Sequence, residues 1–465
     1  MNISMIGFET WLESAANYEK QKKNGEFSLR TISLLANELD NPQLAYKTIH
    51  VAGSKGKGSV STMCASILSE YGFSHGLYTS PHIINFLERV KSVKGFFDNQ
   101  IYEEAAGELV QFVEEVSERL EIAGFSQASW FELVTLFAFI TFKKAGVNFG
   151  VFETGLGGRL DATNILRPEV SVITPIELEH TEYLGDTISK IAFEKAGIIK
   201  ENTPVCVAAQ TKEAEKVFKK VARQKHAPLY FINDAVRKIE CSFENQKTNV
   251  FIDFGDFRLS KKSPALFAKP IKTSLQLAGK VQAYNAALAA LSVKVACPEI
   301  SEDAIERGLS TVEMSGRFEI IDYYYNKSDK ITIVLDGAHT PNSVNLSVDT
   351  YNNYFGSAPC TLLFACAYDK HVEDIAPLFF ESLKAKPKAI YCTKPGDNKP
   401  CDLDRLSNTF EPLCKAHGVE YALSDNYIEM IDLAVKKAVN TTGILFICGS
   451  FYLVAECKKH LKLVA

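Results

Sequence analysis

The sequence predicts an α/β protein with two domains. A strand-like run over residues 46–52 leads into a glycine-rich loop, and a helical pattern follows the loop. Further apolar runs then alternate with helical stretches, which is the pattern of a mostly parallel sheet. A second series of the same kind follows a junction at Glu313–Glu319. We therefore place a first domain over 1–313 and a smaller one over 314–465.

Composition places the chain among ordinary globular proteins. It has 465 residues, of which 46% are hydrophobic and 23% charged, and its net charge of −5 argues against nucleic acid as the main partner. The first residues lack the basic and apolar regions of a signal peptide, and the apolar stretch 133–142 is too short to cross a bilayer. We expect a cytoplasmic protein with no membrane partner. Eleven cysteines without a CxxC pair favour buried thiols over disulfides or zinc.

The loop Gly53–Ser59 (Gly-Ser-Lys-Gly-Lys-Gly-Ser) is the strongest local signal. Glycines let consecutive N–H groups and a helix N-terminus face one anion, Lys57 adds a cation, and Ser59 adds a hydroxyl suited to Mg²⁺. Its spacing is one step off the Walker pattern. A nucleotide-phosphate loop is the favoured interpretation, and a plain structural turn is the alternative.

Periodicity predicts the elements around this loop in order. Two apolar stripes predict helices within 1–45, and Asn41-Pro42 breaks the second. After the loop come a helix that Gly72 ends, a strand at 75–79, an acidic helix over 99–120 and a more buried helix over 129–144. The segment Ser80–Val90, opened by a proline, is either a surface loop or a substrate-binding loop.

Two strands end in polar side chains. The run 150–153 ends in Glu153, and the strand 170–174 leads to His180. Ligands in open α/β sheets bind at the carboxyl ends of strands, so these residues and Ser59 form a candidate Mg²⁺ site, although imidazole is an unusual ligand for this ion. Lys195 lies in an apolar helical turn that closes at Gly197, where a lysine usually extends to solvent.

The rest of the chain completes the two domains. We predict a strand at 204–209, a β-hairpin over 241–259 with its turn at Gly255-Asp256, a helix over 281–296 that carries Asn285, and a short helix over 302–309. The second domain has strand-like runs at 331–335, 361–366, 389–392 and 444–448. The first of these ends in Asp336-Gly-Ala-His339.

A set of motifs resembles the folylpolyglutamate synthase/dihydrofolate synthase family, of the bifunctional type, in the Mur ligase superfamily. The motifs occur in the family's order between residues 46 and 454: His50–Ser59, Phe152–Asn164, His180–Gly185, Glu194–Ile198, Gly316–Glu319, Leu335–His339 and Gly449–Leu453. The resemblance implies a P-loop-type ATPase domain followed by a Rossmann-like ligase domain. It also implies a reaction: a carboxylate of dihydropteroate or a folate attacks the γ-phosphate of ATP, and the amine of L-glutamate then displaces phosphate from the acyl phosphate.

The resemblance also assigns residues to ATP and metal. Two Mg²⁺ ions would be held by Ser59, Glu153, His180 and, if carbamylated, Lys195; a monovalent cation is a further expectation. ATP would bind between the domains, which close to assemble the site, with catalytic roles for Lys57, Lys195 and His339. Its contacts would be Gly53, Ser54, Lys55, Gly56, Lys57, Gly58, Ser59, Asn285, Arg317, Asp336 and His339.

The pterin or folate would contact another set of residues: Ser80, Pro81, His82, Arg89, Ser129, Phe131, Asp161 and Ala162. The resemblance implies that Phe131 stacks on the pterin ring and that Asp161 accepts hydrogen bonds from it. The form Arg-Leu-Asp-Ala resembles the bifunctional enzymes, so we expect both dihydrofolate synthase and folylpolyglutamate synthase activity, with chain extension alone as the alternative. The expected partners are L-glutamate, dihydropteroate and folates, and the expected state is a monomer.

Three other functions remain as alternatives. A Mur-type ligase acting on a nucleotide-linked precursor would need a separate domain before the phosphate loop, for which 45 residues leave too little room. A phosphotransferase or NTPase would not need the second sheet. A catalytically silent nucleotide-binding regulator would not need the intact set of Lys57, Ser59, Glu153, His180 and Lys195.

Overall fold

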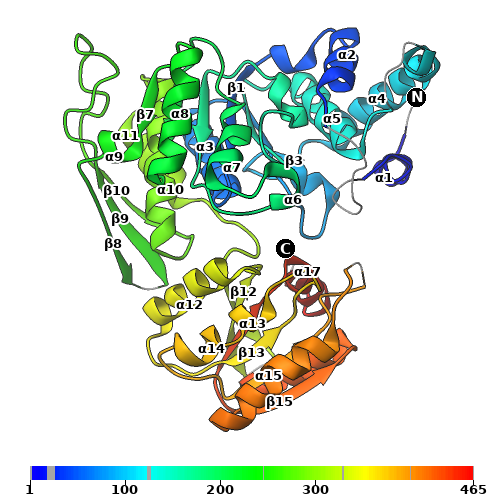
Figure 1. Cartoon of the computed structure of the whole chain (residues 1–465), viewed down its shortest axis with the longest axis vertical. Coiled ribbons are helices and arrows are strands. Elements are labelled where there is room, and N and C mark those ends of the chain that lie inside the picture. Colours follow the sequence, from blue (N-terminus) through cyan, green and yellow to red (C-terminus); the bar gives the residue numbers. More distant parts are fainter. Residues whose placement is uncertain are drawn as a thin grey trace. The chain divides into compact units, whose positions relative to one another are not determined.

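The protein is described by a computed structural model, which covers residues 3–17, 27–122, 127–244, 246–326, 329–397 and 399–463. The chain forms two compact units (Figure 1). The first comprises Met1–Glu240, Val250–Thr273 and Tyr284–Val312. The second comprises Cys241–Asn249, Ser274–Ala283 and Glu313–Ala465, so it takes in two inner segments besides everything from Glu313 onwards.

A seven-stranded sheet forms the centre of the first unit, in the order β3-β2-β4-β1-β5-β6-β7. Neighbouring strands run parallel, except β2 and β3, which are antiparallel. The five inner strands are buried along nearly their whole length, as a parallel sheet with helices on both faces requires. The strands are β1 (Lys47–Ala52), β2 (His75–Tyr78), β3 (Val90–Lys91), β4 (Phe149–Glu153), β5 (Val170–Ile173), β6 (Val205–Val207) and β7 (Leu229–Phe231).

Helices cover this sheet on both sides (Figure 1). One core cluster joins α1 (Met5–Leu12), α2 (Arg30–Glu38), α4 (Asn99–Ile122) and α5 (Trp130–Lys144), and another joins α7 (Ile188–Ala196) and α8 (Lys212–Gln224). The remaining long helices are α3 (Lys57–Tyr71), α10 (Lys280–Ala296) and α11 (Glu302–Ser310), and α11 packs on α3. A Cβ at Gly308 would lie 2.6 Å from the Ile67 backbone, so only glycine allows this close packing.

Short elements connect these helices and strands. They are η1 (Pro42–Leu44), η2 (Phe86–Arg89), η3 (Ala162–Ile165), α6 (Thr181–Leu184) and α9 (Ile232–Ala235). The predicted helices and strands of this part of the chain are confirmed to within a few residues. Gly72 ends α3 in the left-handed conformation, as predicted.

A three-stranded sheet in the order β10-β9-β8 follows, made of β8 (Lys238–Glu244), β9 (Lys247–Asp253) and β10 (Ile271–Leu275). The prediction of its hairpin turn at Gly255-Asp256 is wrong, because the chain turns between Glu244 and Lys247. Gly255 instead lies beyond the end of β9, where its N–H donates to Asp253 Oδ1 (2.8 Å). The buried face formed by Val250, Ile252 and Phe254 is confirmed.

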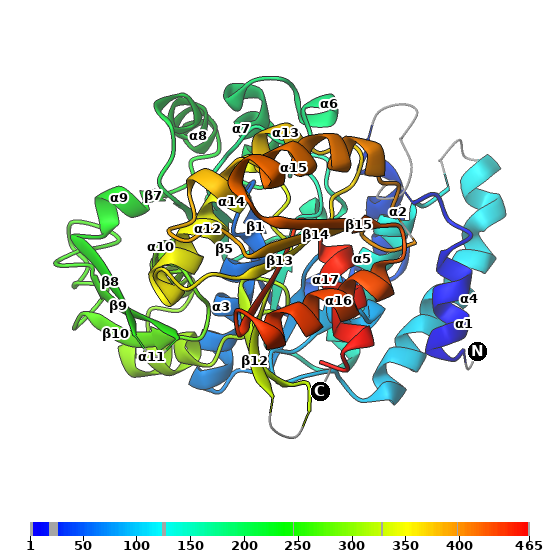
Figure 2. The same ribbon diagram turned by 90° about the horizontal axis from the view of Figure 1, so that it is seen from below.

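The second unit has a six-stranded sheet in the order β11-β12-β16-β13-β14-β15 (Figure 2). It is parallel except for β11, which runs antiparallel to β12. The four predicted strands are present and buried. The half-exposed edge strands β11 and β15 have no continuous apolar run, so sequence analysis missed them. The strands are β11 (Glu319–Tyr324), β12 (Lys330–Asp336), β13 (Thr361–Phe364), β14 (Ala389–Thr393), β15 (Glu420–Ser424) and β16 (Ile444–Cys448).

Six helices complete this unit. The core cluster on one face of the sheet includes side chains of α12 (Pro341–Phe355), α13 (Val372–Ile375), α14 (Leu378–Glu381) and α15 (Leu403–His417). The helices α16 (Tyr427–Asn440) and α17 (Phe451–His460) also pack on the strands. These features confirm the predicted α/β class with two parallel-rich sheets.

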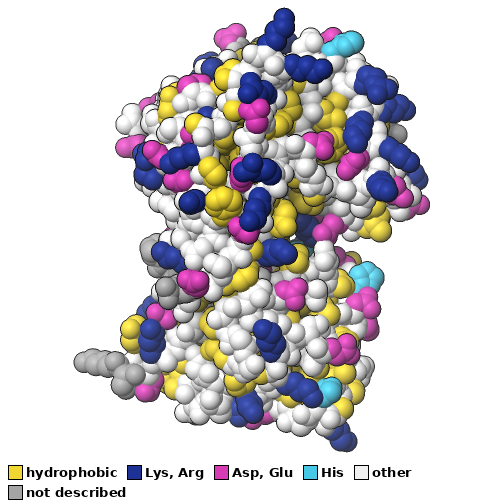
Figure 3. Space-filling view, turned by 90° about the vertical axis from the view of Figure 1, so that its left-hand side faces the viewer, with side chains coloured by type: hydrophobic (Ala, Val, Ile, Leu, Met, Phe, Trp, Pro, Cys, Tyr) yellow, Lys and Arg dark blue, Asp and Glu magenta, His cyan; other side chains and the backbone are white. Residues whose placement is uncertain are grey.

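Surface and thiol properties also bear on the sequence analysis. Nine of the eleven cysteines are buried and the other two are partly buried, so the predicted burial of the thiols is confirmed. Basic and acidic side chains are interspersed on the face shown in Figure 3. In the described parts of the chain, no helix is both long and apolar enough to cross a membrane.

Candidate active site

The phosphate loop connects β1 to α3. Gly53 (φ 146°) and Gly56 (φ 86°) adopt positive φ, and Gly56 is the N-cap of α3. A Cβ at Gly53 would lie 1.8 Å from Thr174 Oγ1, and one at Gly56 would lie 2.8 Å from Asn285 Oδ1. Both glycines are therefore required by close contacts, and Asn285 of α10 lies against the loop, as expected of a residue at the same site.

Three lysines gather around one carboxylate beside this loop. Lys195 Nζ donates to Glu179 Oε1 (3.0 Å) and to the carbonyl of Gly53 (2.7 Å), and Lys55 Nζ lies 3.9 Å from Glu179 Oε2. Burial acts to raise the pKa of Glu179, but the charges of Lys57, Lys195 and Lys55 outweigh it and lower the pKa. This arrangement leaves an excess of positive charge at the phosphate loop.

The structure overturns the solvent-extended interpretation of Lys195. Its side chain is 1% exposed, and burial, followed by the charge of Lys57, lowers its pKa to about 8. The sequence pattern placed Lys195 in an apolar helical turn. The pattern could not reveal that its ammonium donates a hydrogen bond to the carbonyl of Gly53, 142 residues earlier.

Glu179 is a residue that sequence reasoning missed. It lies in the segment between β5 and α6, and the same segment holds the phosphate loop by its backbone. The N–H groups of Ser54 and Lys55 donate to the carbonyl of Pro175 (2.9 and 3.3 Å), and Ser54 Oγ donates to the carbonyl of Glu177 (3.2 Å). The only available sequence signal was an acidic residue directly before His180.

Glu153, which is predicted to be a metal ligand, is buried at the end of β4. It ends β4 opposite Val51 of β1, it is 4% exposed, and its Oε2 accepts from the N–H of Ser80 (3.1 Å). Ser59 is also buried, at the start of α3. His180 is exposed and adopts a positive φ of 46° at the N-terminus of α6.

The segment Ser80–Arg89, predicted to bind the pterin, is held by a buried arginine. Arg89 is 2% exposed, its Nε donates to His82 Nδ1 (2.8 Å), and its guanidinium lies 4.9 Å from the centre of the Trp130 ring. His82 therefore accepts at Nδ1. In this conformation Arg89 supports the loop from inside.

Three more residues predicted for the pterin have identifiable packing roles. Ser129 is the N-cap of α5 in a reciprocal capping box with Glu132. The ring of Phe131 covers Gly155 so closely that a Cβ there would lie 2.5 Å from it. Ala162 is buried at the start of η3. Their predicted contacts with the pterin stay predictions.

Asp161 uses its carboxylate within its own loop. Oδ2 accepts from the N–H groups of Gly155 and Leu156 (2.9 Å each), and Oδ1 accepts from the N–H (3.0 Å) and Oγ1 (2.5 Å) of Thr163. A carboxylate offers about four acceptor positions, so this one is saturated. Thr163 Oγ1 also contacts His50 Nε2 (2.8 Å), which connects the loop to β1.

Two of the nucleotide residues predicted in the second unit, Arg317 and His339, lie beside Phe451. The guanidinium of Arg317 lies 4.4 Å from the centre of the Phe451 ring, and the His339 ring centre lies 6.3 Å from it. Asp336 accepts from Ser347 Oγ (2.6 Å) and from the N–H of Ala338 (3.1 Å). Burial raises the pKa of Asp336 to about 6, although Ser347 and Arg317 act to lower it.

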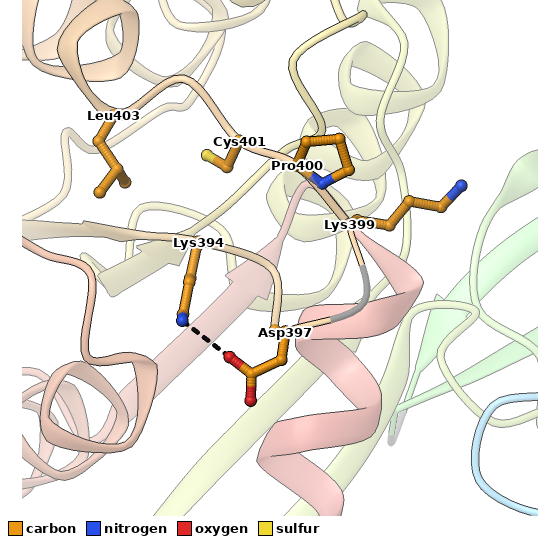
Figure 4. A pocket seen from close by; sticks show the side chains of 7 residues that line it. Lys394, Asp397, Lys399, Pro400, Cys401 and Leu403 are labelled. Atoms are coloured by element: carbon orange, nitrogen blue, oxygen red, sulfur yellow. Dashed lines mark hydrogen bonds and ion pairs between the residues drawn. The ribbon is translucent and has the colours of Figure 1, made fainter. Parts of the chain in front are cut away.

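A separate cavity of about 430 Å³ lies in the second unit, beyond the end of β14. Lys394 Nζ pairs with Asp397 Oδ1 across 2.8 Å, and Lys399 points away from that pair (Figure 4). The described residues that line it are Lys394, Gly396, Asp397, Lys399, Pro400, Cys401 and Leu403, and none of these was predicted for a site.

The sequence matches two protein-family models. Residues 51–293 match the model of the Mur ligase middle domain, and residues 316–451 match that of the Mur ligase, glutamate ligase domain. The chain is 32% identical over 429 residues to the dihydrofolate synthase/folylpolyglutamate synthase of Bacillus subtilis, with 91% of this chain and 92% of the relative covered. The chain belongs to the dihydrofolate synthase/folylpolyglutamate synthase family of Mur ligases.

Solved structures of this family have the same fold. Folylpolyglutamate synthase from Thermotoga maritima superimposes with a TM-score of 0.81 at 28% identity, over 98% of this chain and 96% of that one. A second solved structure, a complex of a folylpolyglutamate synthase with AMPPCP and folate, gives a TM-score of 0.76 at 26% identity over the whole of both chains. The expectation of an ATP-dependent ligase is thus confirmed at the level of the family.

Proposed function

We propose that this member of the family joins L-glutamate to a carboxylate of dihydropteroate or of a tetrahydrofolate, with ATP as the energy source. The observation that carries the proposal is the cationic phosphate loop, where Lys55, Lys57 and Lys195 surround Glu179 in a chain that spans both Mur ligase models. The ammonium groups of Lys55 and Lys57 suit a triphosphate, because they stabilise the charge that moves to the leaving ADP oxygen.

The reaction has two steps. An oxygen of the acceptor carboxylate attacks the γ-phosphorus, so the bond to the β–γ bridging oxygen breaks, giving ADP and an acyl phosphate. The neutral amine of glutamate then attacks the acyl carbon, phosphate leaves, and the amine loses a proton. The protein contributes chiefly by position: Lys57 at the phosphates, and Arg317 with His339 as the contribution of the second unit.

The donor set beside the loop fits Mg²⁺. Ser59 offers a hydroxyl and Glu153 a buried carboxylate, and both oxygen types suit this ion. In the part of the chain that the structure describes, no three His, Cys, Asp or Glu side chains are grouped to hold a metal. Ser59, Glu153 and His180 would therefore supply few ligands and nucleotide oxygens the others, and the ion would neutralise phosphate charge.

Lys195 is the proposed site of carbamylation. Its neutral nitrogen would attack carbon dioxide, form the N–C bond and lose a proton, which converts a cation into an anion. Two observations support this. The side chain is buried, and its pKa of about 8 gives a larger neutral fraction near neutral pH than an ordinary lysine has. The ion pair with Glu179 would then be lost.

Dual activity, with dihydropteroate as well as folates, remains part of the proposal. Since the Asp161 carboxylate is saturated, we assign it the task of shaping the Gly155–Asn164 loop, and we leave recognition of the pterin to Phe131 and the Ser80–Arg89 segment. The monomeric state, the cytoplasmic location and a monovalent cation stay predictions.

The test is incorporation of labelled L-glutamate into amide, run in parallel with 7,8-dihydropteroate and tetrahydrofolate, with ADP measured in the same samples. We expect product and ADP in equal amounts with both acceptors, and neither product nor ADP after removal of Mg²⁺ with a chelator. Product from tetrahydrofolate alone would limit the enzyme to chain extension. ADP without amide from either acceptor would overturn the proposed function.

A further inference from the structure

Helix α17 carries two side chains that hold the turn containing Arg317. Phe451 and Lys458 lie seven residues apart, hence on one face of the helix and separated by about 10 Å along it. The motif Gly449–Leu453, at the start of this helix, has no role in the proposed reaction. Gly449 (φ 107°) fixes the helix start, because a Cβ there would lie 2.2 Å from the carbonyl of Ala365.

The N-terminal end of α17 contacts Arg317 itself. The exposed guanidinium lies over the Phe451 ring at 4.4 Å, within the range of a cation–π interaction. The ring is held in place because it packs on Gly337, where a Cβ would lie 2.4 Å from it. Phe451 therefore gives an exposed, flexible side chain a fixed surface on which to lie.

The C-terminal part of α17 holds the backbone before and after Arg317. Lys458 Nζ donates to Ser315 Oγ (2.6 Å) and Glu319 Oε1 (2.7 Å), and its side chain is 8% exposed. Glu319 Oε2 in turn accepts from the N–H of Gly316 (2.9 Å) and from Ser315 Oγ (3.1 Å). Lys458, Ser315 and Glu319 thus form a hydrogen-bonded network around the turn.

This turn needs such support, because its backbone is unusual on both sides of Arg317. Gly316 has φ 67° and Phe318 has φ 49°. The left-handed conformation is unfavourable for a phenylalanine and persists only where the surroundings enforce it. The Phe318 ring is buried against Tyr354 and Phe446, with 6.1 Å between ring centres in each case.

We propose that Phe451 and Lys458 are positioning residues for the polyphosphate ligand, acting through Arg317. Phe451 orients the guanidinium, and Lys458 fixes the turn from which it extends. The inference rests on the proposed function, in which Arg317 contacts ATP. It goes further by assigning Phe451 and the Lys458–Glu319 ion pair to the binding of that ligand.

The test measures equilibrium binding of AMPPCP to the full-length protein and its variants. We expect Phe451→Leu and Lys458→Met each to weaken binding roughly 3- to 10-fold, the range for losing a cation–π contact or a buried ion pair that orders a ligand group. The conservative variants Phe451→Tyr and Lys458→Arg should bind within about twofold of the unchanged protein, since they keep the ring and the charge. Tyr452→Leu is the matched control, because its ring lies by Lys399 instead, and it should have no effect.

A double-mutant comparison separates positioning from general destabilisation. In an Arg317→Ala background, Phe451→Leu and Lys458→Met should cause no further loss of AMPPCP affinity, because the group they position is gone. The same fold-loss with and without Arg317, or no loss in the single variants, would overturn the inference while leaving the proposed function intact. Failure of the unchanged protein to bind AMPPCP would overturn both.

Discussion

Each unit contains a buried lysine paired with a carboxylate. Lys195 holds the phosphate loop through Gly53 and Glu179, and Lys458 holds the Arg317 turn through Ser315 and Glu319. Both lysines are almost fully buried, at 1% and 8% exposure. In each unit, a lysine near the end of a helix fixes a loop that carries residues assigned to the nucleotide.

The two pairs differ in their charge balance. Of the lysines in the described parts of the chain, Glu319 pairs with Lys458 alone, so the two charges cancel. Glu179 faces Lys195 together with Lys55 and Lys57, so its surroundings retain net positive charge and an anionic ligand can compete for the lysines. The arrangement around Glu179 suits a ligand-binding centre and the one around Glu319 a structural support, although both look alike as lysine–glutamate pairs.

The largest effect is expected at the phosphate loop. Lys57→Ala should lower kcat/KM for ligation on the order of 1000-fold or more, because it removes a cation from the transferring phosphoryl group. Thermal unfolding should stay close to that of the unchanged protein, since Lys57 is partly exposed. Near-normal turnover by Lys57→Ala would remove the basis of the proposed mechanism.

Arginine substitutions test the difference between the two lysines. Lys195→Arg should lower kcat roughly 100-fold, because a guanidinium stays charged and so offers no neutral nitrogen for carbamylation. Lys458→Arg should retain activity, as a closed ion pair needs only the charge. Steady-state kinetics on the two variants would measure this contrast, and equal losses would contradict it.

Removing the carboxylate at the charged centre should strengthen anion binding. With Glu179→Gln, tripolyphosphate should bind about tenfold more tightly at low salt, since Lys55 and Lys57 lose the carboxylate that competes for them, and the gain should shrink as salt rises. Isothermal titration calorimetry would measure the affinity for tripolyphosphate, and Glu177→Gln would be the control for the loss of a nearby negative charge. A similar gain in affinity in both variants would contradict the prediction that Glu179 in particular competes with the anion for the lysines.

A smaller effect, on stability, is expected in the second unit. The pKa of Asp336 is about 6 in the folded protein, above its usual 3.8, so its contribution to stability is present below pH 4 and lost as pH rises through 6. Asp336→Asn lacks this loss. Its unfolding free energy, measured relative to that of the unchanged protein, should therefore be about 1–2 kcal/mol higher at pH 8 than at pH 4. Urea unfolding at the two pH values would measure the gain, and a pH-independent difference would contradict it.

Helices, strands and the ends of strands could be predicted well from the sequence. The hydrogen-bond partners of buried polar side chains could not. Continuous apolar runs revealed the buried strands, and the loop glycines revealed the turn at β1. The hydrogen bonds of Asp161 depend on the fold of its own loop, and those of Lys195 depend on Gly53, 142 residues away. Glu179 had no pattern of its own, since one acidic residue in a loop is common everywhere. Phe451 lies in the Gly449–Leu453 motif, but its contact with Arg317, 134 residues earlier, depends on the fold.

The most direct test of the account follows one oxygen atom. Tetrahydrofolate labelled with ¹⁸O in both carboxylates of its glutamate part would be incubated with the enzyme, ATP, Mg²⁺ and L-glutamate. The released phosphate would then be analysed by ³¹P NMR. An acyl phosphate requires that each phosphate formed with an amide carries one oxygen from one of these carboxylates. Amide formation with unlabelled phosphate would contradict the mechanism proposed for this site.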